Sequence, residues 1–173
     1  MDNIKKFFFF LALLFFSACA LRPPSVTVHS KPGVSIRGGK LGILPFQCLS
    51  PPIGVAVSDV TAANLLGSPF SVIERSYLSQ ILQEQGCSIT GITENPNLEE
   101  IGKLSGVDYL LVGNVTILSQ RRRWIIEATA RIVDVKTGEI VLAVLYKPRS
   151  DNDMLPQPTG EALAVAIRNE TMK

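Results

Sequence analysis

The sequence predicts an α+β fold with an α/β start, in which a single mixed β-sheet is covered by helices. The predicted order of elements is βαβααβββα. Two observations carry this prediction. The first half alternates short apolar runs with amphipathic segments, which is typical of parallel βαβ units. The second half holds a long apolar run followed by two strands around a tight turn, which indicates an antiparallel finish.

The composition limits the function classes before any motif is considered. The chain has 173 residues, of which 17 are Lys or Arg and 15 are Asp or Glu, and 46% are hydrophobic. A chain this apolar can bury a core, so disorder is not expected, and a multidomain enzyme is not expected at this length. The near-neutral charge gives no reason to expect nucleic-acid binding. One His and three Cys leave little material for a metal site, and we expect no cofactor.

The N-terminus has the three parts of an export signal. Lys5 and Lys6 are basic, Phe7–Phe16 is an unbroken apolar run, and small residues precede Cys19. A ten-residue helix rises only about 15 Å, about half the hydrocarbon thickness of a bilayer, so this run is not a spanning helix.

The end of this signal, Phe-Ser-Ala-Cys, resembles a bacterial lipobox. The resemblance implies that Cys19 becomes the first mature residue and is lipidated, for instance with palmitate. Ala20, because it is not Asp, implies sorting to the outer membrane. The alternative is an ordinary secretory signal with an incidental Cys. We therefore expect a signal peptide over residues 1–18 and a lipidated flexible tether over residues 19–40, rich in Pro and Gly. A periplasmic domain is expected over residues 41–173.

Short apolar runs and 3.6-residue periodicity define the predicted elements of the first half. The strands are expected at Leu41–Phe46 and Phe70–Glu74, and the helices at Ile53–Leu66, Arg75–Gln85 and Asn97–Ser105.

The second half begins with a strand whose continuous apolar start indicates cover on both faces. The predicted strands are Asp108–Leu118, Trp124–Val135 and Glu139–Tyr146, and the terminal helix is Thr159–Met172, with Thr159 as its N-cap. Between the last two strands we expect a tight turn with Gly138 at positive φ and Asp134 and Thr137 as its structural residues.

Export would place Cys48 and Cys87 in an oxidising compartment. In the predicted topology Cys48 follows the first strand at one edge of the sheet. The helix before Cys87 carries that residue to the opposite edge, well beyond the roughly 7 Å that a disulfide spans. We therefore expect two reduced thiols.

No catalytic motif is visible in the sequence. There is no Gly-x-Ser-x-Gly elbow and no Cys/His metal spacing, and the lone His29 lies in the predicted tether. We expect no enzymatic activity and no catalytic residues. The run Arg121, Arg122 and Arg123 lies between two predicted strands. It is either a solvated hairpin tip or a contact for anionic lipid headgroups, a glycan phosphate or an acidic partner.

Four segments carry a resemblance to a known family. They are LGILPF, FSVIERSYLSQILQEQG, IGKLSGVDYLLVGNVT and RIVDVKTGEIV, and they span residues 41–146 in that order. Together they resemble the CsgG-like family of outer-membrane lipoproteins, the curli production assembly and transport components. FlgO and LpoB are relatives. The resemblance implies an anticodon-binding-like or TolB N-terminal-like domain on an outer-membrane lipid anchor, acting by assembly with other proteins.

The sequence departs from the channel-forming members at two places. Those members carry two long amphipathic hairpins that form a membrane pore. Here only residues 119–123 and 147–158 occupy the corresponding positions, and a membrane strand needs about 9–11 residues. We therefore expect the periplasmic scaffold without the channel's transmembrane hairpins.

The leading hypothesis is a lipid-anchored periplasmic protein that acts as a non-enzymatic assembly or scaffold component of a cell-envelope machine, such as a curli-type secretion, flagellar or wall-synthesis apparatus. Two alternatives stay open: an accessory or ring-forming subunit of a curli-type secretion channel, and an activator of a peptidoglycan synthase. The expected partners are outer-membrane lipid and periplasmic proteins, including other copies of the chain, with no nucleic acid and no small-molecule substrate. Candidate contact surfaces are the helix over residues 75–85, the tip at Arg121–Arg123 and the turn around Gly138.

Overall fold

The structure is a computed structural model that describes residues 24–34, 36, 38–73, 75–84, 103, 105–119 and 123–173. Several sequence predictions fall outside these residues: the signal peptide, the lipidation site Cys19, Cys87, Arg121 and Arg122, and most of the helix expected at 97–105.

The domain is built on one seven-stranded mixed sheet with the strand order β1-β7-β6-β5-β2-β4, and β3 pairs with β5 beside this path. The pairs β2–β4, β2–β5 and β3–β5 are parallel, whereas β5, β6, β7 and β1 form antiparallel neighbours. The predicted single mixed sheet, with a parallel start and an antiparallel finish, is therefore confirmed. The strands are β1 Ser25–Ser30, β2 Gly39–Ile43, β3 Gln47–Cys48, β4 Phe70–Ile73, β5 Tyr109–Ile117, β6 Ile125–Asp134 and β7 Ile140–Lys147.

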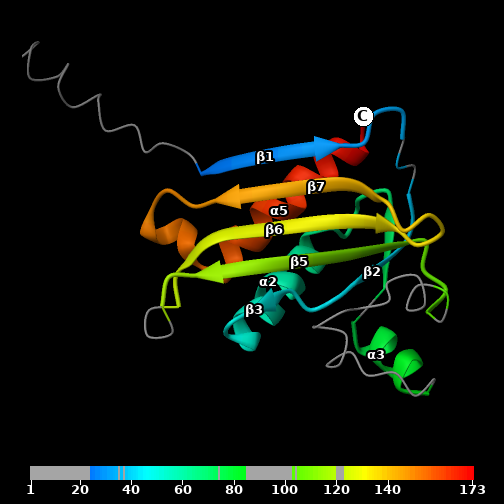
Figure 1. The fold of residues 1–173 in the computed structure, drawn as a ribbon, viewed down its shortest axis with the longest axis horizontal. Helices are drawn as coiled ribbons and strands as arrows, with labels where there is room; N and C mark the ends of the chain where they lie inside the picture. The colour runs from blue at the N-terminus through cyan, green and yellow to red at the C-terminus, as the bar shows by residue number, and fades with distance from the viewer. Residues whose placement is uncertain are drawn as a thin grey trace, which may run out of the picture.

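Helices lie on both faces of this sheet (Figure 1). The helices α2, Pro51–Asn64, and α5, Pro156–Thr171, pack together over one face, and α3, Arg75–Glu84, covers part of the other. Leu78 of α3 is fully buried against Leu44 and Leu110. A short 3-10 helix, η2 at Asp151–Met154, precedes α5. None of the helices in the described part of the chain combines the length and apolar character needed to cross a bilayer.

The main core lies between the sheet and the α2–α5 pair. It includes Leu111, Ile132 and Leu142 from the sheet and Leu163 and Ile167 from α5, each at most 1% exposed. The two helices approach closely at Gly160, where a Cβ atom would lie 2.7 Å from the Cβ of Val60. Glycine at this position is therefore what allows the helices to touch.

The tether prediction differs from the structure in one respect. Ser25–Ser30 forms the edge strand β1, which pairs antiparallel with β7 along its whole length, from Ser25 opposite Lys147 to Ser30 opposite Leu142. The segment contains only two apolar residues, Val26 and Val28, because an edge strand buries little of its surface. Its polar composition resembles that of a loop, and its pairing depends on the free edge of β7.

The prediction of Thr159 as an N-cap is wrong. Helix α5 begins at Pro156 after an N-cap at Leu155, and Thr159 is buried within its first turn. The Thr159 hydroxyl donates to the carbonyl oxygen of Leu155 at 2.8 Å. The helix starts earlier because proline is well suited to the first helical position, where its missing N–H is not needed and its φ is already helical.

Candidate protein-binding groove

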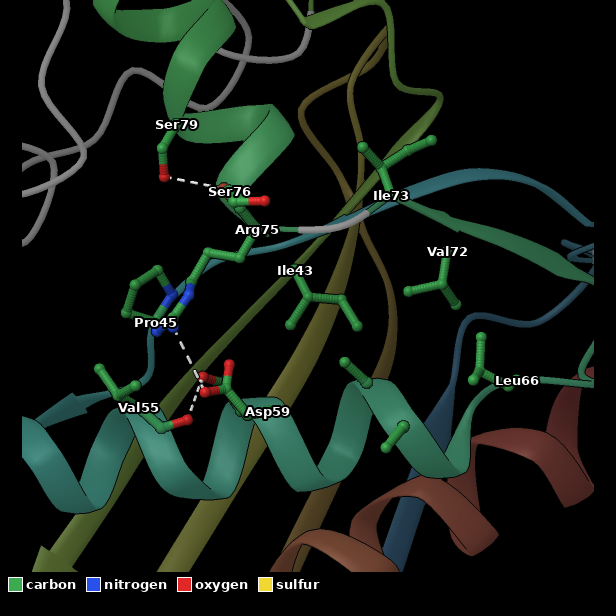
Figure 2. Close-up of a pocket in the computed structure, with 13 residues that line it drawn as sticks. Ile43, Pro45, Val55, Asp59, Leu66, Val72, Ile73, Arg75, Ser76 and Ser79 are labelled. Carbon is green, nitrogen blue, oxygen red and sulfur yellow. Dashed lines mark hydrogen bonds and ion pairs between the residues drawn. The ribbon is translucent and has the colours of Figure 1, made fainter.

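A groove opens between α2 and α3 beside the edge strand β4 (Figure 2). Among the residues that the structure describes, β4 pairs with β2 alone and forms one edge of the sheet. We call this feature the α2–α3 groove, and its volume is about 770 Å³. It is lined by Ile43, Pro45, Val55, Ser58, Asp59, Ala62, Ala63, Leu66, Val72, Ile73, Arg75, Ser76 and Ser79.

The walls of the α2–α3 groove are mainly apolar. Ile43 lies at its base and is 3% exposed, whereas Val72 and Ile73 of β4 are half-buried. Leu66, just beyond the end of α2, is 68% exposed, and Ala63 one turn earlier is also exposed. Apolar side chains exposed along a groove are typical of surfaces that bind the apolar side chains of another protein segment.

One ion pair crosses the α2–α3 groove. The guanidinium of Arg75, at the start of α3, lies 3.3 Å from the carboxylate of Asp59 in α2. Figure 2 shows the Arg75 side chain extending past Pro45 toward Asp59. Because both side chains are more than a third exposed, the pair contributes little to folding, roughly 0–1 kcal/mol. The pair places two charged groups within an otherwise mainly apolar surface.

Two of the three serine hydroxyls that line the α2–α3 groove, those of Ser58 and Ser79, donate hydrogen bonds to backbone carbonyls of their own helices. Ser58 donates to the carbonyl oxygen of Val55 at 2.8 Å, and Ser79 donates to that of Arg75 at 2.7 Å. The α2–α3 groove thus presents apolar carbon atoms and one ion pair, which suits binding of a protein segment.

The perturbed titratable groups lie away from the α2–α3 groove. Burial, with a smaller contribution from Asp153, raises the pKa of Tyr146 to about 12. Burial and the neighbouring Asp134 and Asp108 raise the pKa of Tyr109. Hydrogen bonds from Lys173 and Ser30 lower the pKa of Glu170. Within the described residues there is no group of three or more His, Cys, Asp or Glu side chains placed to hold a metal ion.

The turn residues predicted from the sequence lie together between β6 and β7. The Asp134 carboxylate accepts hydrogen bonds from the backbone N–H groups of Lys136 at 2.8 Å and Thr137 at 3.1 Å. Gly138 has a φ of 70° and its N–H donates to the Asp134 carbonyl oxygen. The Thr137 hydroxyl oxygen accepts from the N–H of Glu139 at 3.3 Å. These residues shape the turn and lie far along the sheet from the β5–β6 connection.

The other residues considered in the sequence analysis are dispersed. Arg123 is exposed, has a φ of 54°, and donates its backbone N–H to the carbonyl oxygen of Ser119 at 2.9 Å. Cys48 is a free thiol that accepts a hydrogen bond from the N–H of Ser50 at 3.4 Å. His29 is exposed on β1. The structure therefore does not bring these residues together into one site.

The exposed residues of α3 were predicted from the sequence as a contact surface, but the α2 residues that line the other side of the groove were not. The sequence feature that could have indicated these residues is the presence of apolar side chains in α2 outside its buried face. Ile53, Val57 and Thr61 are buried against the core, whereas Ala62 and Ala63 lie outside that face. A helix with more apolar residues than one face requires is expected to contact something on a second side.

The open mixed sheet and its covering helices define a small α+β domain with an apolar groove open to solvent between α2 and α3. Residues 43–124 match the model of the family described as "Curli production assembly/transport component CsgG". The match confirms, for these residues, the resemblance to this family that was predicted from the sequence. No match was found among the sequences of curated proteins.

Solved structures share this fold at low sequence identity. Lipoprotein GNA1162 from Neisseria meningitidis is 16% identical with a TM-score of 0.55, over 75% of this chain and 94% of that chain. The LpoB C-terminal domain from Salmonella enterica is 17% identical with a TM-score of 0.50, over 68% of this chain and 87% of that chain. The PelC dodecamer from Paraburkholderia phytofirmans is 16% identical with a TM-score of 0.49, over 82% and 97% of the two chains. For GNA1162 and the LpoB domain, the likeness at these identities concerns the fold alone.

Proposed function

We propose that this protein is a lipid-anchored periplasmic component of the outer membrane that helps to assemble a cell-envelope machine without catalysing a reaction. The observation that carries the proposal is the CsgG family match over residues 43–124. The matched region contains α2, β4 and α3, which are the elements that form the α2–α3 groove.

The anchor in this proposal is Cys19, after cleavage of residues 1–18. Support comes from the sequence pattern: a basic start, an apolar run of ten residues and small residues directly before the cysteine. Several acyl chains on one residue hold a protein firmly on a bilayer, since each buried methylene contributes about 0.8 kcal/mol. Radiolabelled palmitate should enter the wild-type chain in cells and not the Cys19→Ser variant. Equal labelling of the two would contradict the anchor.

The assembly role is supported by the chemistry of the α2–α3 groove. Apolar surface that stays open to water in an isolated domain is expected to be covered when a partner binds. The Asp59–Arg75 pair would give such a partner a polar contact and an orientation. We expect the partner to be another periplasmic or outer-membrane protein of the same machine.

Site-specific photocrosslinking in cells tests this role. A photoreactive residue is placed at Ser76, which is exposed and lines the α2–α3 groove, in the full-length chain. The matched control carries it at Thr116, an exposed position on β5 outside the groove. A discrete crosslinked protein at position 76 and none at 116, identified as an envelope-assembly component, is the expected result. Equal crosslinking at both positions, or none at 76, would contradict the proposal.

A further inference from the structure

Strand β1 shortens the link between the folded domain and the proposed anchor at Cys19. If the tether extended to residue 40, about 20 residues of chain would separate the lipid from the domain, enough to span about 70 Å. With β1 beginning at Ser25, six peptide units join Cys19 to the sheet. A fully extended chain covers at most about 3.3–3.6 Å per residue, so Ser25 lies within about 20 Å of the anchored residue.

The structure also shows why β1 stays attached to the sheet. All six of its residues pair with β7. At the far end of the strand, the Ser30 hydroxyl donates to the Glu170 carboxylate at 3.1 Å, and the Lys31 ammonium pairs with the Glu139 carboxylate. The backbone N–H of Lys31 also donates to the carbonyl oxygen of Val141 at 3.0 Å. These contacts to α5, to the β6–β7 turn and to β7 hold β1 on the sheet, so that it is part of the folded domain and not of the tether.

With the anchor proposed at Cys19, the end of the sheet where β1 begins is the end held near the bilayer. Ser25 is opposite Lys147 at the end of β7, and the same end carries the last residues of β5 and the first residues of β6 (Figure 1). Exposed residues at this end include three leucines and three basic side chains. We call this surface the proximal edge: Leu49, Leu118, Arg123, Lys147, Arg149 and Leu155.

The chemistry of the proximal edge suits a phospholipid surface. Leu49, Leu118 and Leu155 are 72%, 60% and 49% exposed, and apolar side chains with basic neighbours are typical of surfaces that contact lipid headgroups. The acidic groups nearby are Glu127, which pairs with Lys147 at 3.2 Å, and Asp151 and Asp153.

Two helices add positive potential at the proximal edge. Both α2 and α5 begin there, and neither has an acidic residue in its first turn. The N-terminal end of each helix carries a partial positive charge that no side chain of that turn offsets. This adds to the attraction of the basic side chains for anionic headgroups.

We propose that the proximal edge faces and contacts the phospholipid headgroups of the membrane that anchors the chain, so that the sheet stands with its β6–β7 turn directed away from the bilayer. This inference rests on the proposed lipid anchor at Cys19. The strands are long enough to make the two ends of the sheet distinguishable, because eight residues of β7 span about 27 Å.

The single tryptophan of the chain, Trp124, lies in the β5–β6 connection at the proximal edge and serves as the reporter. The acylated protein is reconstituted into vesicles of phosphatidylethanolamine and phosphatidylglycerol that carry headgroup spin labels. The matched control is the double variant Trp124→Phe/Lys136→Trp, which moves the fluorophore to the exposed β6–β7 turn. Circular dichroism establishes that both proteins are folded.

We expect a large loss of Trp124 emission with spin-labelled lipid, and no loss for the tryptophan introduced by Lys136→Trp. Equal quenching of both, or stronger quenching at position 136, would overturn the orientation. Absence of quenching at both positions in a palmitate-labelled protein would overturn the lipid contact while leaving the anchor intact. Failure of palmitate to enter the wild-type chain would overturn the anchor itself, and the orientation with it.

Discussion

The hydroxyl of Tyr146 donates a hydrogen bond to the backbone carbonyl oxygen of Asp153 at 2.9 Å. Tyr146 is fully buried near the end of β7, and Asp153 lies in η2, which leads into α5. This one bond therefore joins the sheet to the segment that positions α5.

Replacing Tyr146 with Phe should lower the free energy of unfolding by about 0.5–1.5 kcal/mol, because the bond is lost while the ring volume is kept. Urea denaturation of the variant measures this change. Tyr77, which is 57% exposed, offers the matched control, and Tyr77→Phe should leave stability nearly unchanged. Equal effects of the two substitutions would show that the Tyr146 hydroxyl is not a structural link.

Stability should fall in alkaline solution in a way that depends on Tyr146. Burial raises the pKa of this phenol from its ordinary value of 10.0 to about 12 in the folded protein, so the folded state holds the phenol proton more tightly than the unfolded chain does. The stabilisation is fully present below pH 10.0 and is lost as pH rises toward about 12, since the unfolded chain then ionises first. Tyr109, with its raised pKa, contributes in the same direction.

The measurement is urea denaturation at a series of alkaline pH values. Tyr146→Phe should show a shallower loss of stability above pH 10.0 than the wild type. Parallel curves for the two proteins would mean that Tyr146 titrates alike in the folded and unfolded states.

A methyl group at position 160 should be costly. Gly160→Ala places a Cβ 2.7 Å from the Cβ of Val60, so α2 and α5 must move apart, and overpacking of this kind costs roughly 1–3 kcal/mol. The double variant Gly160→Ala/Val60→Ala should recover part of this loss, and a double-mutant cycle measures the coupling. Strict additivity of the two substitutions would contradict direct contact between the helices at this point.

Filling the α2–α3 groove should abolish partner binding without unfolding the domain. Ala63 is exposed on the groove wall, so Ala63→Glu adds a charge there and is expected to change stability by no more than about 0.5 kcal/mol. Crosslinking from Ser76 should be lost in this variant. Thr116→Glu, on β5 outside the groove, should leave that crosslinking unchanged. Crosslinking that persists in Ala63→Glu would place the partner elsewhere.

Sequence periodicity was sufficient for the elements that bury a regular face. The strand over Tyr109–Ile117 and the helix over Arg75–Glu84 lie within a residue of their expected bounds, because a long apolar run marks the strand and a 3.6-residue apolar period marks the helix. The turn at Asp134 and Gly138 was also visible, since Asp and Gly have specific roles in tight turns.

The elements that depend on distant partners were not visible. Strand β1 is polar and forms on the free edge of β7, more than a hundred residues later. Strand β3 is two residues long and exists through its pairing with Asn114 and Val115 of β5. The α2–α3 groove forms between two helices beside β4, and the distance between these helices cannot be predicted from the residue pattern of either helix.

The attachment of β1 also determines how the domain responds to mechanical load. Tension on the lipid anchor that we propose at Cys19 would act on the first residue of β1 and along that strand. The hydrogen bonds between antiparallel strands run across the strand direction, so such a pull loads the β1–β7 ladder in shear. In that geometry all the β1–β7 hydrogen bonds bear the force at the same time instead of breaking one after another. Movement of the membrane would therefore move the whole domain before it separated β1 from β7.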